Sequence, residues 1–450
     1  MLKKALNIVF DRTPDETIDL FEVFPGLRRF FERRRLHAFV RTIGDLVFAF
    51  IILVGLFGPQ DPDRNCILYL SWGLWWPTIV LSWFFVGRMW CGFCPFPGLG
   101  RLVQNLGLRL DLPIPRSLQK NGPYLSVLLL CLIIWIEEST GIKDSPRATA
   151  LLIMAIMTGA TITAVFFPKQ AWCRYLCPMG RLLGVGSTIS MLEFRPDLEK
   201  CKGCKTFACK KGLDGKTGCP VFLGAFSVRN NLDCLICGHC LSLCDKDSPK
   251  LNIRSPFKEL LVNKGRFITC SYIIPFLMGS QLVRFYIESG LAMKVDHGSF
   301  ATMMLYSGLL AIGFCYVYFL IRIGANFFGI TEDELFGRFS PMVPIFVPMA
   351  FAGELAYRLD YAVKNAPNFF PTLGRQFYVD FFKKLTFSIP EWFFPVMNVF
   401  IIGSAIVACN YVLYRMVTDE FEGMISKIRV FLVSSVIFVA GISYIFFMVL

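Results

Sequence analysis

The sequence predicts a mainly α-helical protein, a polytopic bundle of about nine transmembrane helices interrupted by one hydrophilic, cysteine-rich domain. Two observations lead to this prediction. Of the 450 residues 55% are hydrophobic, and several apolar stretches approach the ~20 residues that a helix needs to cross a bilayer. In addition, twelve of the 17 cysteines stand in pairs or runs of short spacing within residues 91–244, which is typical of metal ligands rather than of disulfides.

The apolar stretches divide the chain into four parts. Residues 1–42 form a polar arm whose basic run GLRRFFERRR is expected to lie as a cytoplasmic, interfacial helix. Residues 43–192 form a four-helix membrane domain, residues 193–258 the hydrophilic domain, and residues 259–450 a second membrane domain of about five helices. The expected spans lie at about 42–58, 67–87, 122–137, 148–167, 267–287, 299–321, 339–357, 392–414 and 428–450.

Charge indicates the orientation. Residues 88–120 carry five basic side chains against one acidic, and residues 168–266 carry seventeen against eight. Because Lys and Arg are enriched in cytoplasmic loops, we expect the N-terminus and the hydrophilic domain in the cytoplasm. The same explanation accounts for the net charge of +13. No basic-aromatic binding motif accompanies that charge, so no nucleic acid partner is predicted.

A repeated motif ends the second and the fourth span. WCGFCPFPGLGRLV and WCRYLCPMGRLLGV both place Trp-Cys and then Cys-Pro after an apolar run. Sites in membrane proteins often lie between such repeats, so the two cysteine pairs are expected to face each other. The four thiols are those of Cys91, Cys94, Cys173 and Cys177. Three interpretations stay open: a third iron or iron-sulfur centre, which the chain-turning prolines favour, a dithiol relay, or structural packing.

The hydrophilic domain carries eight more cysteines. DCLICGHCLSLCD has the spacing C-x2-C-x2-C-x3-C, as in two-cluster bacterial ferredoxins, where the fourth cysteine binds the other cluster. Upstream, CKGCKTFACKKGLDGKTGCP supplies four cysteines at wider spacing. One predicted 4Fe-4S cluster is bound by Cys201, Cys204, Cys209 and Cys244, and the other by Cys219, Cys234, Cys237 and Cys240. Zinc is the competing metal, and two interlocking sets argue against it. The fold class is therefore a transmembrane helical bundle with an inserted cytoplasmic two-cluster (2 × 4Fe-4S) ferredoxin domain.

These motifs together resemble a family. Two helix pairs that each end in a Cys-Pro motif, followed by a two-cluster ferredoxin, are similar to the NapH/NosR-type polytopic membrane ferredoxins over about residues 40–260. The resemblance implies electron transfer between quinol, iron-sulfur clusters and a partner redox protein in the prokaryotic cytoplasmic (inner) membrane. The chain departs from the family pattern in its C-x2-C-P first motif, its stretched first ferredoxin motif and the helices after residue 260.

The expected function is that of a membrane-bound iron-sulfur electron-transfer subunit. It would relay electrons between the quinone pool and a partner redox protein in a prokaryotic respiratory complex. Its expected partners are membrane lipid, quinone and other redox subunits, namely a reductase, a cytochrome or an iron-sulfur protein. No catalytic residue is predicted, and a subunit of an oxidoreductase complex is favoured over a complete enzyme. The alternatives are a redox-active assembly or maturation factor for a metalloenzyme, or a membrane anchor for soluble redox subunits.

Four ionisable side chains lie in or near the apolar segments after residue 260. These are Arg284, Glu288, Glu354 and Arg358. Ionisable groups at membrane depth usually have a function, such as quinone binding. Snorkelling of the arginines to the interface accounts for them equally well.

Overall fold

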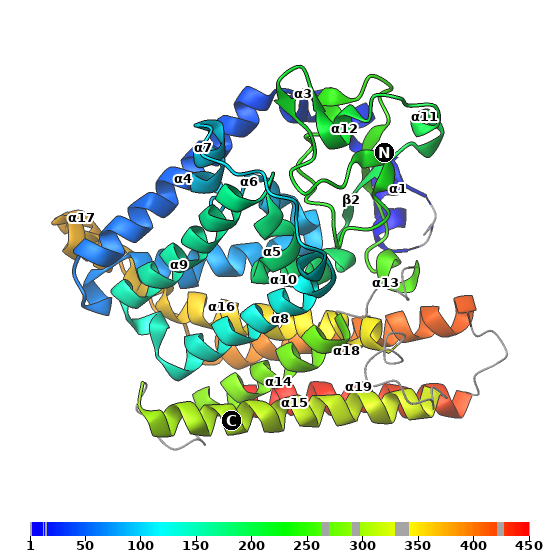
Figure 1. Cartoon of the computed structure of the whole chain (residues 1–450). Coiled ribbons are helices and arrows are strands. Elements are labelled where there is room, and N and C mark those ends of the chain that lie inside the picture. Colours follow the sequence, from blue (N-terminus) through cyan, green and yellow to red (C-terminus); the bar gives the residue numbers. More distant parts are fainter. Residues whose placement is uncertain are drawn as a thin grey trace. The chain divides into compact units, whose positions relative to one another are not determined.

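The computed structural model describes residues 2–11, 13, 16–262, 270–289, 298–328, 342–420 and 427–449. The chain forms two compact units, and both are mainly helical (Figure 1). The first unit consists of residues Met1–Ile52, Ser82–Leu129 and Leu151–Glu259. The second consists of Leu53–Leu81, Leu130–Ala150 and Leu260–Leu450.

Seven of the described helical segments are long and apolar enough to cross a membrane. They are Arg34–Phe57, Tyr69–Asn105, Arg116–Ser139, Pro146–Phe166, Phe300–Phe328, Phe393–Thr418 and Lys427–Met448. The two remaining predicted spans correspond to helices α14 (Cys270–Glu288) and α16 (Val343–Phe377), which carry charged side chains within them. The predicted fold class, a helical membrane bundle, is confirmed.

The first unit contains, wholly or in part, the helices from α1 to α13. Those of the arm and the first span are α1 (Leu2–Val9), α2 (Leu20–Val23), α3 (Pro25–Glu32) and α4 (Arg34–Phe57). The membrane repeat follows with α5 (Trp76–Val86), α6 (Trp90–Phe93), α7 (Gly98–Asn105), α8 (Arg116–Ser139), α9 (Pro146–Phe166) and α10 (Pro178–Gly186). The cysteine-rich segment adds the short helices α11 (Leu198–Cys201), α12 (Ala208–Lys211) and α13 (Lys258–Val262).

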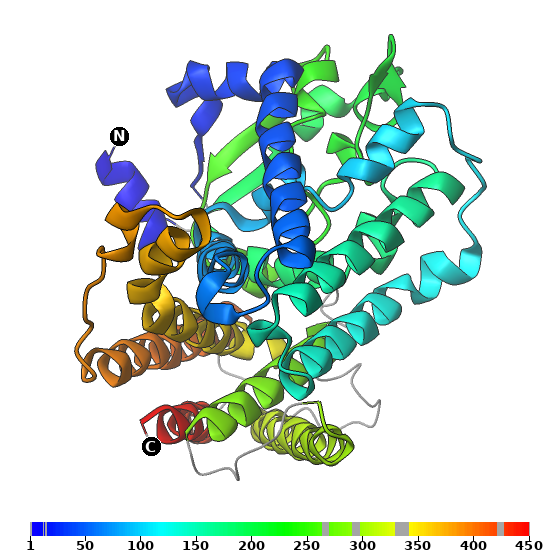
Figure 2. The ribbon, with the colours of Figure 1, turned by 90° about the vertical axis from the view of Figure 1, so that its left-hand side faces the viewer.

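A small antiparallel sheet joins the amino-terminal arm to the cysteine-rich segment. Strand β5 (Pro249–Ile253) lies between β1 (Ile18–Asp19) and β2 (Leu192–Pro196). Phe194 of β2 pairs with Leu251 of β5, and both side chains are buried. A separate hairpin is formed by β3 (Gly212–Leu213) and β4 (Lys216–Thr217). The blue helices of the arm therefore lie beside the green strands of the sheet (Figure 2).

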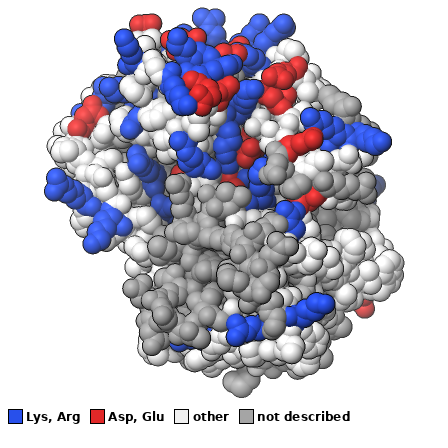
Figure 3. Space-filling model, turned by 90° about the vertical axis from the view of Figure 1, so that its right-hand side faces the viewer, with Lys and Arg blue, Asp and Glu red and all other residues white. Residues whose placement is uncertain are grey.

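The arm also fills the core of the cysteine-rich segment. Phe21 of α2 and Phe31 of α3 are buried against Phe194, Ile236 and Leu251. The arm was expected at the membrane interface, but one face of α3 is taken up by this core. Arg28 of the same helix donates hydrogen bonds to Asp247 at 3.0 Å and to Glu32 at 2.8 Å. Charged side chains gather on the described surface of this unit, as Figure 3 shows for one face.

The second unit is a bundle of long helices. Its carboxy-terminal members are α14, α15 (Phe300–Phe328), α16, α17 (Asp380–Lys383), α18 (Phe393–Glu420) and α19 (Lys427–Val449). Helix α14 packs against α15 and α16, and α18 packs against α16 and α19. A β-carbon on Gly279 of α14 would lie 2.6 Å from the carbonyl carbon of Gly313 of α15. Small residues thus allow two backbones to approach closely, as is common between membrane helices.

A network of buried charges lies inside this bundle. Arg358 donates to Glu137 at 2.5 and 3.0 Å and to Glu354 at 2.8 Å, and Arg284 donates to Glu354 at 3.4 Å. None of these four side chains is more than 3% exposed. Buried charges are tolerated when each is paired and hydrogen-bonded. Three of the four ionisable residues singled out in the sequence therefore meet in one place, and the fourth, Glu288, is the last residue of α14.

Candidate metal centre

The two membrane motifs have different backbones. In the first motif, helix α6 ends at Phe93, and Cys94 is extended before Pro95. In the second motif, Cys177 donates its backbone N–H to the carbonyl of Trp172 at 2.8 Å, the i to i−5 bond of a π-helical turn. This wider turn absorbs the extra residue of the C-x3-C spacing. Both motifs then turn at Cys-Pro, because the residue before proline avoids the helical region.

The structure brings the four thiols of these motifs together. Cys94 interacts electrostatically with Cys91, Cys173 and Cys177. Burial and the neighbouring thiolates of Cys177 and Cys91 raise the pKa of Cys173. Burial and Cys91 raise the pKa of Cys177 to about 11, although its sulfur accepts the backbone N–H of Gly180 at 3.2 Å. The predicted facing of the two pairs is therefore present in the fold, and a metal at this position stays a prediction.

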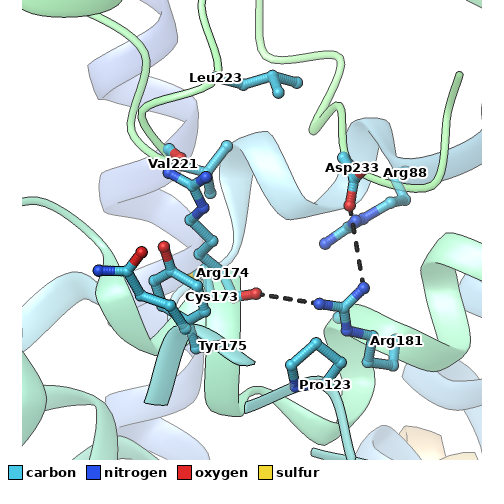
Figure 4. Close-up of a pocket in the computed structure, with 11 residues that line it drawn as sticks. Arg88, Pro123, Cys173, Arg174, Tyr175, Arg181, Val221, Leu223 and Asp233 are labelled. Atoms are coloured by element: carbon cyan, nitrogen blue, oxygen red, sulfur yellow. Dashed lines mark hydrogen bonds and ion pairs between the residues drawn. The ribbon is translucent and has the colours of Figure 1, made fainter. Parts of the chain in front are cut away.

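Three arginines surround this thiol quartet. Arg88 is 5% exposed, lies beside Cys91 and Cys177, and donates to the carbonyl of Leu232. Figure 4 shows Arg174 and Arg181 lining a cavity of about 220 Å³ next to Cys173. Arg181 donates to the backbone carbonyl of Arg174 at 3.4 Å and pairs with Asp233 at 3.9 Å. A buried guanidinium beside two of the four thiolates would offset part of the negative charge that a thiolate-bound cluster carries.

The predicted second ferredoxin set also meets in space. Cys219, Cys234, Cys237 and Cys240 all line one small cavity whose other walls are mostly apolar. Backbone N–H groups point at the sulfurs, since Leu223 donates to Cys219 at 3.3 Å. Ile236 and Gly238 take left-handed backbone conformations, with φ of 50° and 71°. A buried β-branched residue rarely adopts this conformation, so the loop is held in a constrained path around the four sulfurs.

The predicted first ferredoxin set is linked through Ser248. The Cys201 sulfur lies 3.1 Å from the Ser248 hydroxyl, and the backbone N–H of Ser248 donates to Cys244 at 3.4 Å. Cys209 interacts electrostatically with Cys244 and with Cys204. These contacts bring members of the first set near one another, and the interlocked assignment of the two sets stays a prediction.

The hairpin of β3 and β4 explains the stretched spacing of the first ferredoxin motif. With its turn, the hairpin spans residues 212–217, six of the nine residues between Cys209 and Cys219. The backbone N–H of Cys219 then donates to the carbonyl of Cys209 at 2.9 Å. The insert thus loops out without separating the two cysteines.

The membrane motif and the second ferredoxin set touch each other. A β-carbon on Gly92 would lie 2.9 Å from the β-carbon of Cys237 and 3.0 Å from its α-carbon. Cys91, Cys173 and Cys219 pack against the buried cluster that contains Cys237. Because Gly92 has no side chain, the backbone between Cys91 and Cys94 can lie directly against Cys237 of the second ferredoxin set.

The donor chemistry fits iron-sulfur clusters. Burial raises the pKa of Cys234 to about 11 and also raises the pKa of Cys237 and of Cys240, with the neighbouring cysteines adding to the effect. Such thiols ionise together only when a cation is present, so metal binding and thiol deprotonation are coupled. Among the described residues no three His, Cys, Asp or Glu side chains converge on a single-ion site. A cubane has a different requirement, because its four thiolates bind four separate irons.

Sequence reasoning missed several residues of this region. Arg88, Gly92 and Phe31 hold or surround the cysteine loops, and nothing in the motif spacing singled them out. A glycine between two cysteines was a usable signal for close backbone approach. The contact of Phe31 with Gly238, where a β-carbon would lie 2.4 Å from the Phe31 ring, depends on residues about 200 positions apart.

Comparisons with known proteins agree with this chemistry. The family described as "4Fe-4S binding domain" matches residues 68–113 and 149–187, the segments that contain the four membrane-motif cysteines. The uncharacterized protein MJ0749 of Methanocaldococcus jannaschii is 29% identical over 175 residues, which cover 38% of this chain and 65% of that protein. No solved structure matches the chain.

Two relatives from Escherichia coli carry informative names. YccM, named as a candidate electron transport protein, is 25% identical over 222 residues, covering 44% of this chain and 59% of YccM. The ferredoxin-type protein NapH is 24% identical over 176 residues, covering 36% of this chain and 60% of NapH. The chain thus spans about two thirds or less of each of these three relatives. The resemblance to membrane ferredoxin-type proteins is confirmed, and the chain is similar to iron-sulfur proteins of membrane electron transport.

Proposed function

We propose that the protein is a membrane-bound subunit that relays electrons between the quinone pool and a partner redox protein of a prokaryotic respiratory complex. The contact between Gly92 and Cys237 carries the proposal, because it supports a continuous path from the membrane motifs into the ferredoxin set. The matched family also covers both membrane motifs. We therefore assign a third iron-sulfur centre to Cys91, Cys94, Cys173 and Cys177, beside the two predicted in residues 201–244.

The clusters, when bound, would supply one-electron transfer with little reorganisation. The chain contributes the surroundings. Cys234 and Cys237 are only 9% exposed, so water is largely excluded from the second ferredoxin set. Backbone N–H groups donate to the sulfurs of Cys177, Cys219 and Cys244. Such donors, together with buried Arg88, favour the thiolate form and raise the reduction potential of a thiolate-bound cluster.

The opposite end of the path is more open. The segment around Cys204 is exposed at Lys202 and Lys205 on either side. A hydrogen bond from the backbone of Phe207 lowers the pKa of Cys204. We infer that the first ferredoxin set exchanges electrons with the partner, whose docking surface would be acidic to match these lysines. The positive-inside distribution supports a cytoplasmic position for this end.

Cluster content and reducibility test the proposal. Protein purified under argon should contain about twelve irons per chain if three cubanes are bound. Cys94→Ser should lose about four of them, whereas Cys315→Ser, an exposed cysteine of α15, should lose none. A quinol added to the wild-type protein should reduce the clusters, as followed by electron paramagnetic resonance. Absence of reduction by quinol together with absence of oxidation by any acidic redox partner would refute the relay.

A further inference from the structure

A third cavity lies between α4, the end of α7 and the loops of the cysteine-rich segment. Its volume is about 750 Å³, and all of its walls belong to the first unit. That volume lies within the range of small-molecule sites. Its lining includes two of the three histidines of the chain, His37 and His239.

The two histidines carry free ring nitrogens. His37 is 3% exposed, and neither its Nε2 nor Nδ1 of His239 has a hydrogen-bond partner among the described residues. The two ring centroids lie 5.1 Å apart. The His37 ring also makes a hydrogen bond with the backbone of Cys237, and because Nε2 has no partner we assign this bond to Nδ1. A neutral imidazole that donates through one nitrogen accepts through the other, so Nε2 of His37 is a buried acceptor that calls for an O–H donor.

Each imidazole also adjoins a cysteine set. The His37 ring stacks on Phe93 at 4.4 Å between centroids, and Phe93 lies between Cys91 and Cys94 in the chain. His239 lies between Cys237 and Cys240. A molecule that touches both imidazoles would therefore be linked to the membrane thiol quartet through His37 and Phe93, and to the second ferredoxin set through His239.

Helix α4 has one face on the cavity and an apolar face on the other side. Arg34, His37, Ala38 and Arg41 of α4 line the cavity. The opposite face of the same helix exposes apolar side chains, namely those of Phe39, Ile43, Leu46 and Phe50. A ligand with a polar head and an apolar tail could place its head in the cavity and keep its tail in the bilayer.

The cavity is also positively charged. Seven of its lining side chains are Lys or Arg and two are Asp. Such a field favours oxygen atoms that carry partial negative charge. A lipid phosphate meets this condition, but it has no proton to offer the acceptor Nε2 of His37 at neutral pH. A quinol has both the hydroxyl donors and the aromatic ring.

We propose that this cavity binds the head group of a quinol, with a hydroxyl donated to Nε2 of His37 and the second oxygen at Nδ1 of His239. The proposal rests on the proposed relay and names the place where its lipid-borne substrate binds. Binding alone is assigned to these residues.

Fluorescence quenching of 2-heptyl-4-hydroxyquinoline N-oxide, a quinol analogue with an aliphatic tail, tests the site on the full chain in neutral lipid. The wild type should bind one probe per chain. His37→Phe keeps an aromatic ring against Phe93 and should weaken binding about tenfold, the loss expected for one hydrogen bond. His37→Gln should bind more tightly than His37→Phe, because its amide oxygen accepts. Arg35→Gln is the matched control, since Arg35 lies on α4 outside the cavity lining and should bind as the wild type does.

The outcomes separate the site from the relay. If the wild type and His37→Phe bind the probe equally at unchanged iron content, the proposed quinol site is wrong. If quinol still reduces the clusters in that case, the proposed electron relay is retained. Absence of both binding and reduction in the wild type would overturn both. If phosphatidylglycerol vesicles displace the probe while phosphatidylcholine vesicles do not, the cavity binds lipid head groups and the proposal is wrong.

Discussion

Gly92→Ala tests the contact between the membrane motif and the ferredoxin loop. The new β-carbon would lie 2.9 Å from the β-carbon of Cys237 and 3.0 Å from its α-carbon. Carbon atoms pack at about 3.5–4.0 Å, so the two segments must separate by about 0.6–1.1 Å. The obstructing atoms belong to or adjoin the backbone of a constrained loop, so a side-chain rotation cannot relieve the clash. Overpacking of this kind costs about 1–3 kcal/mol.

The assay is thermal loss of the iron-sulfur absorbance in protein purified under argon. A cost of about 1–3 kcal/mol should lower the apparent Tm by about 2–12 °C for a unit of this size. The separation should also change the magnetic interaction between the membrane centre and the second ferredoxin cluster. Gly26→Ala is the matched control, because a β-carbon on Gly26 has open space around it and Gly26 lies in helix α3 of the same unit. If Gly92→Ala melts like Gly26→Ala with unaltered cluster spectra, the reasoning about this contact is refuted.

Three further predictions concern charge and metal. A hydrogen bond from the Arg28 guanidinium lowers the pKa of Asp247. The pair therefore stabilises the fold fully above the ordinary carboxyl pKa, and this stabilisation is lost only as the pH falls through the lowered pKa of Asp247. Because both side chains are partly exposed, Asp247→Asn should lower the free energy of unfolding by at most about 1 kcal/mol. The resulting loss of Tm should be the same from pH 8 to pH 5. A loss of Tm that disappears by pH 6 would contradict this prediction. Glu137→Gln leaves buried Arg358 short of a charge partner and should cost about 3–5 kcal/mol, measured by the helical circular dichroism melt; an unchanged melt would contradict it. Removal of iron by a chelator should abolish protection of the backbone amides in residues 201–244 from hydrogen exchange while the membrane helices keep theirs, whereas retained protection would show that this segment folds without metal.

Much of the architecture could be predicted because it depends on local properties. A transmembrane helix is a run of apolar residues, and the seven candidate spans follow the predicted ones closely. Helix α14 lies close to its predicted span, whereas α16 continues to Phe377, twenty residues beyond the predicted end at 357. The buried ion pairs, such as that of Arg358 with Glu137, could not be foreseen, because 221 positions separate the partners.

The cysteine sets stay a prediction, which rests on ligand spacing. Ligand spacing reflects the shape of the metal group, which is the same in many proteins. The path of the chain between ligands depends on packing at a distance. Phe31 against Gly238 and His37 against Phe93 are contacts of this kind, and the arm was therefore expected at the membrane rather than in the ferredoxin core.

The proposed interlocking of the two ferredoxin sets would make the arm, the sheet and the clusters depend on one another. Cys234 and Ile236 belong both to a ligand loop and to the buried core that Phe21 and Phe31 complete. A cluster that fixes Cys234 therefore also fixes the core, and the arm that covers the core limits access of water to the loop. Because Cys244 is assigned to the other set, loss of either cluster frees one end of the DCLICGHCLSLCD segment. Folding of this domain and binding of both clusters should accordingly be one cooperative event, in which a single missing thiolate such as that of Cys244 reduces the occupancy of both sites.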